Sequence, residues 1–298
     1  MLPLPIHARI AVVAPAGVFS TDRLARGIEV VRSWGHSVVE APNLRCQHRY
    51  CAGTASERTA DLIWALTEPG IDAVWFARGG YGTVHTLANL PWDLLDGRPV
   101  IGFSDATALH AAFWSKGFRT VHGPVLQGLC DYDLQAAPPV VCADPESRKS
   151  VQALLSTGRA APLPAEPFCG PDAVVRGPVV GGNLSVLASL SGTPWALRGQ
   201  GAIVVLEDVG EAPYRIDRLL TQLIDCGTFD GAVGVALGDF NQCRSEVASY
   251  GVRDVLHDLL QPLGLPVVAG VPVGHTAHNY AWIHGEVGEL RPDGIDWP

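Results

Sequence analysis

The sequence contains no run of eighteen or more apolar residues, so it predicts no membrane-spanning helix and no membrane partner. No basic stretch precedes the apolar segment at 9–14, so we interpret this segment as a strand and not as part of a signal peptide. Positive charge is sparse, with 21 Lys and Arg against 30 Asp and Glu and a formal net charge of −9. Because no basic cluster is present, nucleic acid is not expected as a partner.

The cysteines do not form a pattern that defines a disulfide framework. They are seven in number, an odd count, and lie scattered along the chain. Cys226, Cys243 and His257 lack the spacing of metal ligands. We therefore expect no metal, no organic cofactor and a cytoplasmic location.

The first half of the chain alternates strand and helix patterns. Helices are expected from Ser20, from Ser56 and directly after Ser104, each following or preceding a short apolar run. Strands are predicted at 9–14, 37–41, 73–76 and 100–103. Such alternation with short connections favours an α/β fold with a doubly wound, mainly parallel sheet.

A change in composition divides the chain. Residues 131–172 are rich in proline, with one short helical pattern near 151–155. We therefore predict an N-terminal domain at 1–135, an interdomain linker at 136–175 and a C-terminal domain at 176–298.

The strongest chemical signal is the segment 100–107, VIGFSDAT. An apolar strand ends in a Gly-x-Ser-x-small turn and a helix follows at once, which lifts the hydroxyl of Ser104 clear of the sheet. Small residues at Gly102 and Ala106 suit a tight turn, and the helix amides can stabilise an oxyanion. The alternative is that Ser104 only caps the helix.

A glycine-rich turn, RGGYG at 78–82, follows the preceding strand and should lie at the same edge of the sheet as Ser104. Its Arg78 could bind a substrate carboxylate, although a plain turn with a solvated arginine fits equally well. Asn183 follows two glycines and either helps to bind an anion or simply starts a helix. We take Arg78, Tyr81 and Asn183 as candidate substrate-binding residues.

A hydroxyl nucleophile needs a base, and the base needs an orienting carboxylate. His275 lies in a Pro- and Gly-containing loop after an apolar strand, and Glu207 ends another apolar strand. Each residue alone is more often structural, but together they give the order Ser, acid, His along the chain. The nearest rivals for these roles are His278, His284 and Asp208.

Four segments together resemble the LD-carboxypeptidases, a serine peptidase family that includes the microcin-immunity peptidases. The segments are 102–105 (GFSD), 181–184 (GGNL), 207–218 (EDVGEAPYRIDR) and 274–275 (GH), in that order. The resemblance runs from about residue 12 to about 288, and segment 207–218 is more similar to the murein branch than to the immunity branch.

The resemblance implies a flavodoxin-like N-terminal domain, similar to class I amidotransferases, and a swivelling β/α C-terminal domain in a homodimer. It implies Ser104 as nucleophile, with Glu207 and His275 completing the triad. The implied oxyanion hole consists of the amides of Asp105, Gly79 and Gly80.

The family's usual reaction leads to the first hypothesis, a serine carboxypeptidase that releases the terminal D-alanine from a cytosolic murein tetrapeptide during peptidoglycan recycling. The implied partner is thus a small peptide whose third residue is meso-diaminopimelate or lysine. An alternative is an immunity-type peptidase that cleaves a peptidyl- or aminoacyl-nucleotide, with Trp282 as the platform for the base. A third is a ligand-binding protein in which Ser104 has no catalytic role.

Overall fold

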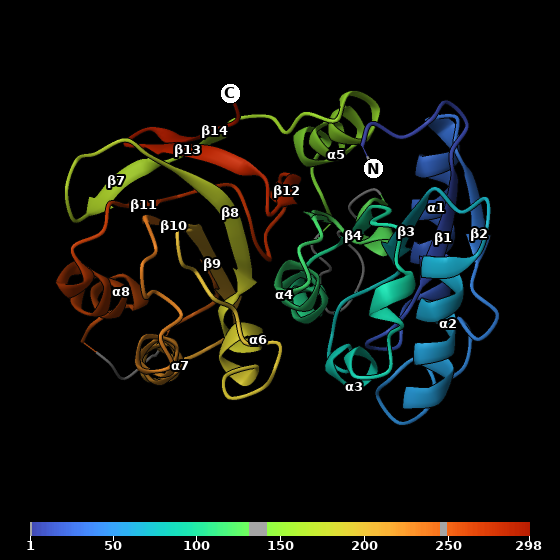
Figure 1. Cartoon of the computed structure of the whole chain (residues 1–298), viewed down its shortest axis with the longest axis horizontal. Helices are drawn as coiled ribbons and strands as arrows, with labels where there is room; N and C mark the ends of the chain where they lie inside the picture. Colours follow the sequence, from blue (N-terminus) through green and yellow to red (C-terminus); the bar gives the residue numbers. More distant parts are fainter. Residues whose placement is uncertain (1, 131–141, 245–248) are drawn as a thin grey trace.

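The computed structural model describes residues 2–130, 142–244 and 249–298. Two sheets lie side by side, and helices α4 (Thr107–Ser115) and α6 (Leu184–Ser189) meet between them (Figure 1). Within the described residues, no helix has the length and apolar character needed to span a membrane.

The first sheet consists of parallel strands and one antiparallel strand from the far end of the chain. The strands are β1 (Arg9–Val13), β2 (Ser37–Glu40), β3 (Ala73–Phe76), β4 (Val100–Gly102), β5 (Thr120–His122) and β12 (Trp282–His284). Among the residues described, their order is β12-β5-β4-β3-β1-β2, with β1 to β5 parallel and β12 antiparallel to β5. The parallel sheet predicted for the first half is confirmed.

Two helices of this half, α1 (Thr21–Ser33) and α2 (Ala55–Thr67), are amphipathic and begin at side-chain caps. Besides these two and α4, this half contains α3 (Val84–Leu87) and the short 3₁₀ turns η1 (Trp92–Leu94), η2 (Ser104–Ala106) and η3 (Leu126–Gly128). Ser20 caps α1 as predicted. In α2 the cap is Thr54 and not Ser56, because Thr54 and Glu57 form a reciprocal capping box.

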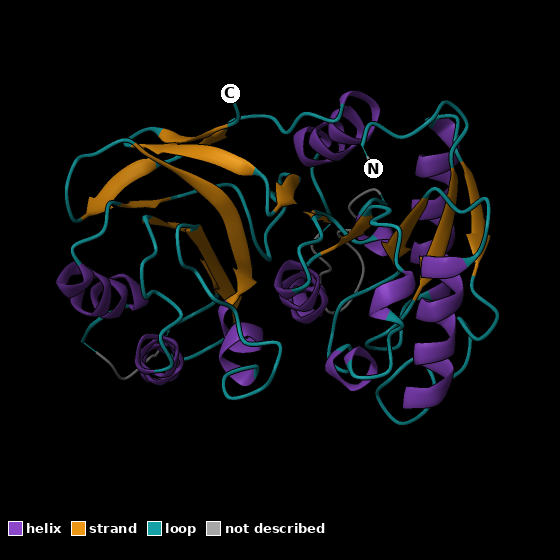
Figure 2. Ribbon diagram, in the orientation of Figure 1, coloured by secondary structure: helices purple, strands orange, loops and turns teal. Residues whose placement is uncertain are grey.

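The second sheet is mixed (Figure 2). Its strands are β6 (Leu163–Pro164), β7 (Glu166–Cys169), β8 (Val175–Asn183), β9 (Ile203–Val209), β10 (Gly234–Asn241), β11 (Val267–Ala269), β13 (Val287–Arg291) and β14 (Gly294–Asp296). In the described structure their order is β6-β14-β13-β8-β9-β10-β11-β7, with β8 to β11 parallel. The helices of this half are α5 (Pro145–Thr157), α6, α7 (Pro213–Asp225), α8 (Val252–Leu260) and the 3₁₀ turn η4 (Gln261–Leu263).

The observed organisation differs from the predicted linker at 136–175. Within that range, α5 is a full helix, and β6 and β7 are strands of the second sheet. Residues 131–141 of the proline-rich stretch lie outside the described residues. Proline is tolerated in β6 and β7 because both are edge strands, where a missing N–H breaks no central ladder.

The two sheets are tied together by packing and by β12. One buried apolar cluster contains Ile10 and Ile101 of the first sheet and Val204 and Leu237 of the second. Strand β12, far along the chain, pairs with β5 and so completes the first sheet. These contacts fix the facing edges of the two sheets relative to each other.

Helix α1 approaches η3 closely enough to exclude any side chain at Gly27. A Cβ added to Gly27 would lie 1.9 Å from the carbonyl oxygen of Leu126. Such a separation is far inside van der Waals contact, so the helix and the 3₁₀ turn would have to move apart.

Gly27→Ala should therefore destabilise the protein by about 1–3 kcal/mol, although alanine is the better helix former by about 1 kcal/mol. Chemical denaturation of the purified variant would measure this. Arg26→Ala, an exposed change on the same helix, should stay within about 0.5 kcal/mol of wild type. A Gly27→Ala variant that is as stable as wild type or more stable would contradict the close approach.

Candidate active site

Ser104 sits on a sharp turn between β4 and α4. Its backbone has φ of +64°, a left-handed conformation that a non-glycine residue adopts only under local constraint. A Cβ on Gly102 would lie 2.9 Å from Cβ of Ala106 and 3.1 Å from the ring of Phe76, so position 102 must be glycine and position 106 small. The tight turn predicted from the VIGFSDAT segment is confirmed.

The structure brings Ser104, Glu207 and His275 together, although they come from the turn after β4, from β9 and from the loop after β11, respectively. The Nε2 atom of His275 lies 2.9 Å from Oγ of Ser104, and its Nδ1 lies 2.7 Å from Oε2 of Glu207. The Glu207 side chain is fully buried and that of His275 is 19% exposed. This arrangement lets imidazole take a proton from the hydroxyl while the carboxylate fixes the ring tautomer.

The charges around His275 favour its protonated form. Burial alone lowers the pKa of the imidazole, but the charge and hydrogen bond of Glu207, together with the charge of Asp208, outweigh it. The pKa of His275 is therefore raised above its ordinary value of 6.5. The Phe103 ring, with its centroid 4.8 Å from that of His275, covers one side of the imidazole.

The other candidates for the base and the carboxylate, His278, His284 and Asp208, have different partners in the structure. His284 is fully buried and its Nε2 accepts the amide of Gly181, while His278 contacts Asp144 and is 65% exposed. Asp208 accepts hydrogen bonds from the side chain of Asn183 and from the amide and hydroxyl of Ser185. None of these three contacts Ser104 in the described hydrogen-bond network.

The turn Gly79–Gly80 lies against Ser104. A Cβ on Gly79 would be 2.7 Å from Cβ of Ser104, so only glycine allows this approach. Gly80 has φ of +116°, which also favours glycine. The Asp105 side chain is buried and accepts the amide of Thr83 at 2.8 Å, which links the two turns. Burial raises the pKa of Asp105, against the lowering effect of the hydrogen bonds from Thr83.

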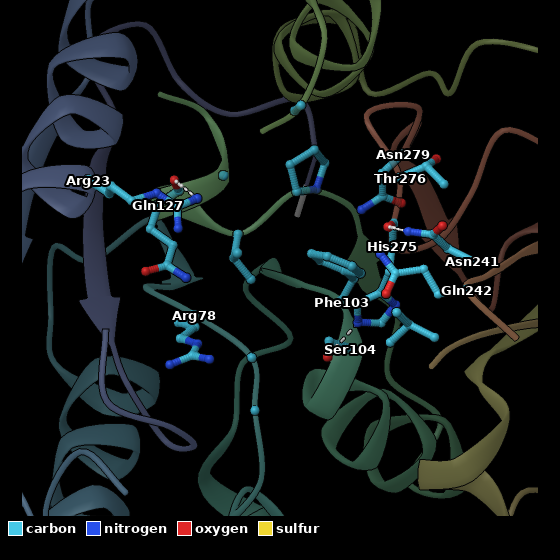
Figure 3. A pocket seen from close by; sticks show the side chains of 17 residues that line it. Arg23, Arg78, Phe103, Ser104, Gln127, Asn241, Gln242, His275, Thr276 and Asn279 are labelled. Atoms are coloured by element: carbon cyan, nitrogen blue, oxygen red, sulfur yellow. Dashed lines mark hydrogen bonds between the residues drawn. The ribbon is translucent and has the colours of Figure 1, made fainter. Parts of the chain in front are cut away.

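A pocket of about 330 Å³ opens beside Ser104 and His275 (Figure 3). Arg78 lines it across from Ser104 and donates from Nη1 to the carbonyl of Val18. A second pocket of about 300 Å³ reaches the other side of Ser104 and is lined by Tyr81 and Asn183. All three predicted substrate-binding residues thus border a pocket that includes Ser104.

Tyr81 and Asn183 differ in what their side chains can offer. Tyr81 is 49% exposed and its ring packs against Tyr50 and His85. Asn183 is buried, and its Oδ1 accepts the amide of Val186 as the N-cap of α6. The structural alternative weighed for Asn183, a helix start, is confirmed.

Trp282 cannot serve as a platform for a nucleotide base. Its side chain has no exposed surface and stacks between His122 and His284, with ring centroids 5.1 and 5.6 Å away. The interpretation based on its proximity in sequence to His275 was wrong, because β12 carries Trp282 into the core of the molecule.

Two further contributions to the site were missed. Arg23, in the first turn of α1, lines the same pocket as Arg78. The hydroxyl of Ser147 on α5 donates to the carbonyl of Ala277 and accepts the amide of Asn279, and the hydroxyl of Ser150 accepts the amide of Ala281. Helix α5 thereby fixes the loop that follows His275. The sequence carried little signal, because an arginine or serine on a helix usually faces solvent.

In the described part of the chain no group of three or more His, Cys, Asp or Glu side chains is placed to hold a metal ion.

Comparison with known proteins gives matches over both halves. Residues 10–123 match the model of the LD-carboxypeptidase N-terminal domain, and residues 176–290 match that of the C-terminal domain. A murein tetrapeptide carboxypeptidase from Pseudomonas aeruginosa is 35% identical over 297 residues, covering 98% of this chain and 96% of that protein.

Solved structures resemble this chain over nearly its whole length. The crystal structure of a muramoyltetrapeptide carboxypeptidase from Oxalobacter formigenes has a TM-score of 0.83 and 28% identity, covering 98% of this chain and all of that one. The microcin C7 self-immunity protein MccF of Escherichia coli is 27% identical over 292 residues, covering 88% of this chain and 83% of that protein. Two domain models in the expected order, and a relative at 35% identity along nearly the whole length, show that this chain belongs to the LD-carboxypeptidase family.

Proposed function

We propose that this protein is a serine carboxypeptidase that hydrolyses the bond before the terminal D-alanine of a murein tetrapeptide. The observation that carries the proposal is the hydrogen-bonded series Ser104–His275–Glu207 at the edge of a pocket. The P. aeruginosa relative, itself named a murein tetrapeptide carboxypeptidase, supports this substrate class.

In the proposed mechanism, Oγ of Ser104 attacks the carbonyl carbon of the third residue while Nε2 of His275 takes the hydroxyl proton. Glu207 accepts the hydrogen bond from Nδ1 and stabilises the imidazolium that forms. The oxyanion is held by the amides of Asp105 and of the Gly79–Gly80 turn. His275 then gives its proton to the leaving amine of D-alanine.

The second half of the reaction releases the acyl group. His275, neutral again, takes a proton from water as the water attacks the ester carbonyl. The tetrahedral intermediate collapses, Ser104 recovers its proton from His275, and the tripeptide leaves. Arg78 is proposed to hold the terminal carboxylate, because a carboxypeptidase must recognise a free C-terminus and a guanidinium can bind one with two hydrogen bonds.

We also propose a fold type for each of the two units and an oligomeric state for the protein. The order β5-β4-β3-β1-β2 of parallel strands supports a flavodoxin-like N-terminal unit. We further propose that the C-terminal unit, beginning near residue 176, has the swivelling β/α fold, and that the protein is a homodimer with a cytoplasmic location. Light scattering of the purified protein would measure the assembly.

Ser104→Ala should lower kcat for D-alanine release by about three or more orders of magnitude, because the nucleophile is lost. Mass spectrometry of the products from murein tetrapeptide measures this. Ser115→Ala, which changes an exposed serine at the end of the helix that follows Ser104, is the matched control and should match wild type. Near wild-type release by Ser104→Ala would refute the mechanism, and release of the amino acid only from a nucleotide-linked peptide would favour the immunity-type activity.

The acid limb of the kcat/KM profile should lie above pH 6.5 in the wild type, because the base works when neutral and the pKa of His275 is raised. Glu207→Gln removes the charge that raises this pKa, so the limb should move to lower pH while kcat falls. Glu166→Gln, an exposed charge change, should leave the profile in place. An unshifted limb in a folded Glu207→Gln variant would contradict the role of the carboxylate.

Ser147→Ala should lower kcat/KM about tenfold, because the amide of Asn279 loses its acceptor and the His275 loop loses a support. The acid limb should keep its pKa, since neither Glu207 nor Asp208 is changed. Ser156→Ala, at an exposed position of α5, serves as control. Kinetics equal to wild type would show that α5 does not position the loop.

A further inference from the structure

The pocket beside Ser104 is positively charged in an acidic protein. The described residues that line it include Arg23 and Arg78 and no Asp or Glu, while the chain as a whole carries a net charge of −9. Within the described residues, neither arginine forms an ion pair with a carboxylate. Both arginines lie on the side of the pocket that faces Phe103, Ser104 and His275 (Figure 3).

Each of the two guanidinium groups donates a hydrogen bond to a backbone carbonyl. Arg78 donates from Nη1 to the carbonyl of Val18, and Arg23 donates from Nη2 to the carbonyl of Gln127 at 3.3 Å. A guanidinium has five N–H donors, so each arginine keeps further donors for a ligand. The carbonyl contacts also restrict both side chains, which lowers the entropy lost when an anion binds.

Among the described residues, no carboxylate pairs with the positive charge of Arg23. Arg23 lies in the first turn of α1, where the helix dipole disfavours cations. Its contacts with the carbonyl of Gln127 and, at 3.8 Å, with the sulfur of Cys142 need only a neutral donor. An anion bound in the pocket would give the positive charge of Arg23 a partner.

One arginine suffices for the terminal carboxylate that any carboxypeptidase substrate carries. We propose that Arg23 binds a second carboxylate of the peptide, while Arg78 binds the terminal one. This inference rests on the proposed function, since it concerns the same site and the same reaction. It makes Arg23 a specificity-determining residue that favours peptides with an additional free carboxylate.

Two carboxylates of a murein tetrapeptide have the required chemistry. One is on the side chain of a diaminopimelate at the third position, where lysine has only an ammonium group. The other is the free α-carboxylate of the γ-linked glutamate at the second position. The lining offers no described acidic partner for a lysine ammonium, and either carboxylate could fill the role of the second anion.

The experiment compares wild type and Arg23→Gln on three tetrapeptides that end in D-alanine. The first has both additional carboxylates, the second has lysine in place of diaminopimelate, and the third has the glutamate carboxylate amidated. Arg23→Gln should lower kcat/KM for the first peptide by about 10- to 100-fold, the effect of losing a charged hydrogen bond. It should have much less effect on whichever peptide lacks the carboxylate that Arg23 binds.

Arg26→Gln is the matched control, because it removes the same charge from an exposed position of the same helix outside the pocket. It should leave the relative rates for the three peptides unchanged, and thermal unfolding should show that both variants fold. If Arg23→Gln lowers kcat/KM equally for all three peptides, or for none, the inference about Arg23 is overturned while the carboxypeptidase proposal stands. If wild type releases D-alanine from none of them, the proposed function itself fails.

Discussion

The hydrogen bonds that His275 forms with Ser104 and with Glu207 join groups that belong to different sheets. Ser104 follows β4 of the first sheet, whereas Glu207 lies on β9 of the second and His275 follows β11. A hydrogen bond tolerates changes of only a few tenths of an ångström, so the facing edges of the two sheets must be held at a fixed separation. Much of the remaining structure can be understood from this requirement.

Three features hold the facing edges of the two sheets at this fixed separation. The apolar cluster that contains residues of both sheets limits their relative movement. Helix α5 binds the backbone of the loop after His275 through Ser147 and Ser150. On the other side, Gly79 packs against Ser104 so closely that its Cα has no room for a side chain. The groups are thus positioned by packing and by backbone hydrogen bonds, which are more rigid than contacts between long side chains.

The sequence predicted the local features well because each depends on neighbours in the chain. The turn at Ser104 needs only an apolar strand, small residues at 102 and 106 and a helix start, all within eight positions. The pairing of His275 with Glu207 was suggested by a family resemblance and by their positions after strands, which limits where such side chains can point. The parallel direction of the first strands, though not their order in the sheet, followed from the alternation of strand and helix.

What the sequence did not reveal depends on contacts between distant segments. The proline-rich stretch looked like a linker, since nothing local shows that Ser147 binds a loop 130 residues later. Trp282 was misplaced because β12 crosses from the second half of the chain into the first sheet. Arg23 and Arg78 are 55 positions apart and line the same pocket, and the helix α1 that carries Arg23 packs closely against η3 at Gly27.

The crossing of β12 has a consequence for the order of events during synthesis. Until residues 282–284 have left the ribosome, β5 is an edge strand with an open row of hydrogen-bonding groups. The loop of His275 precedes these residues by only a few positions, so in the proposed mechanism the catalytic base also joins the site late in synthesis. Nearly the same stretch of chain thus closes an exposed sheet edge and completes the proposed site, so both events belong to the last stage of synthesis.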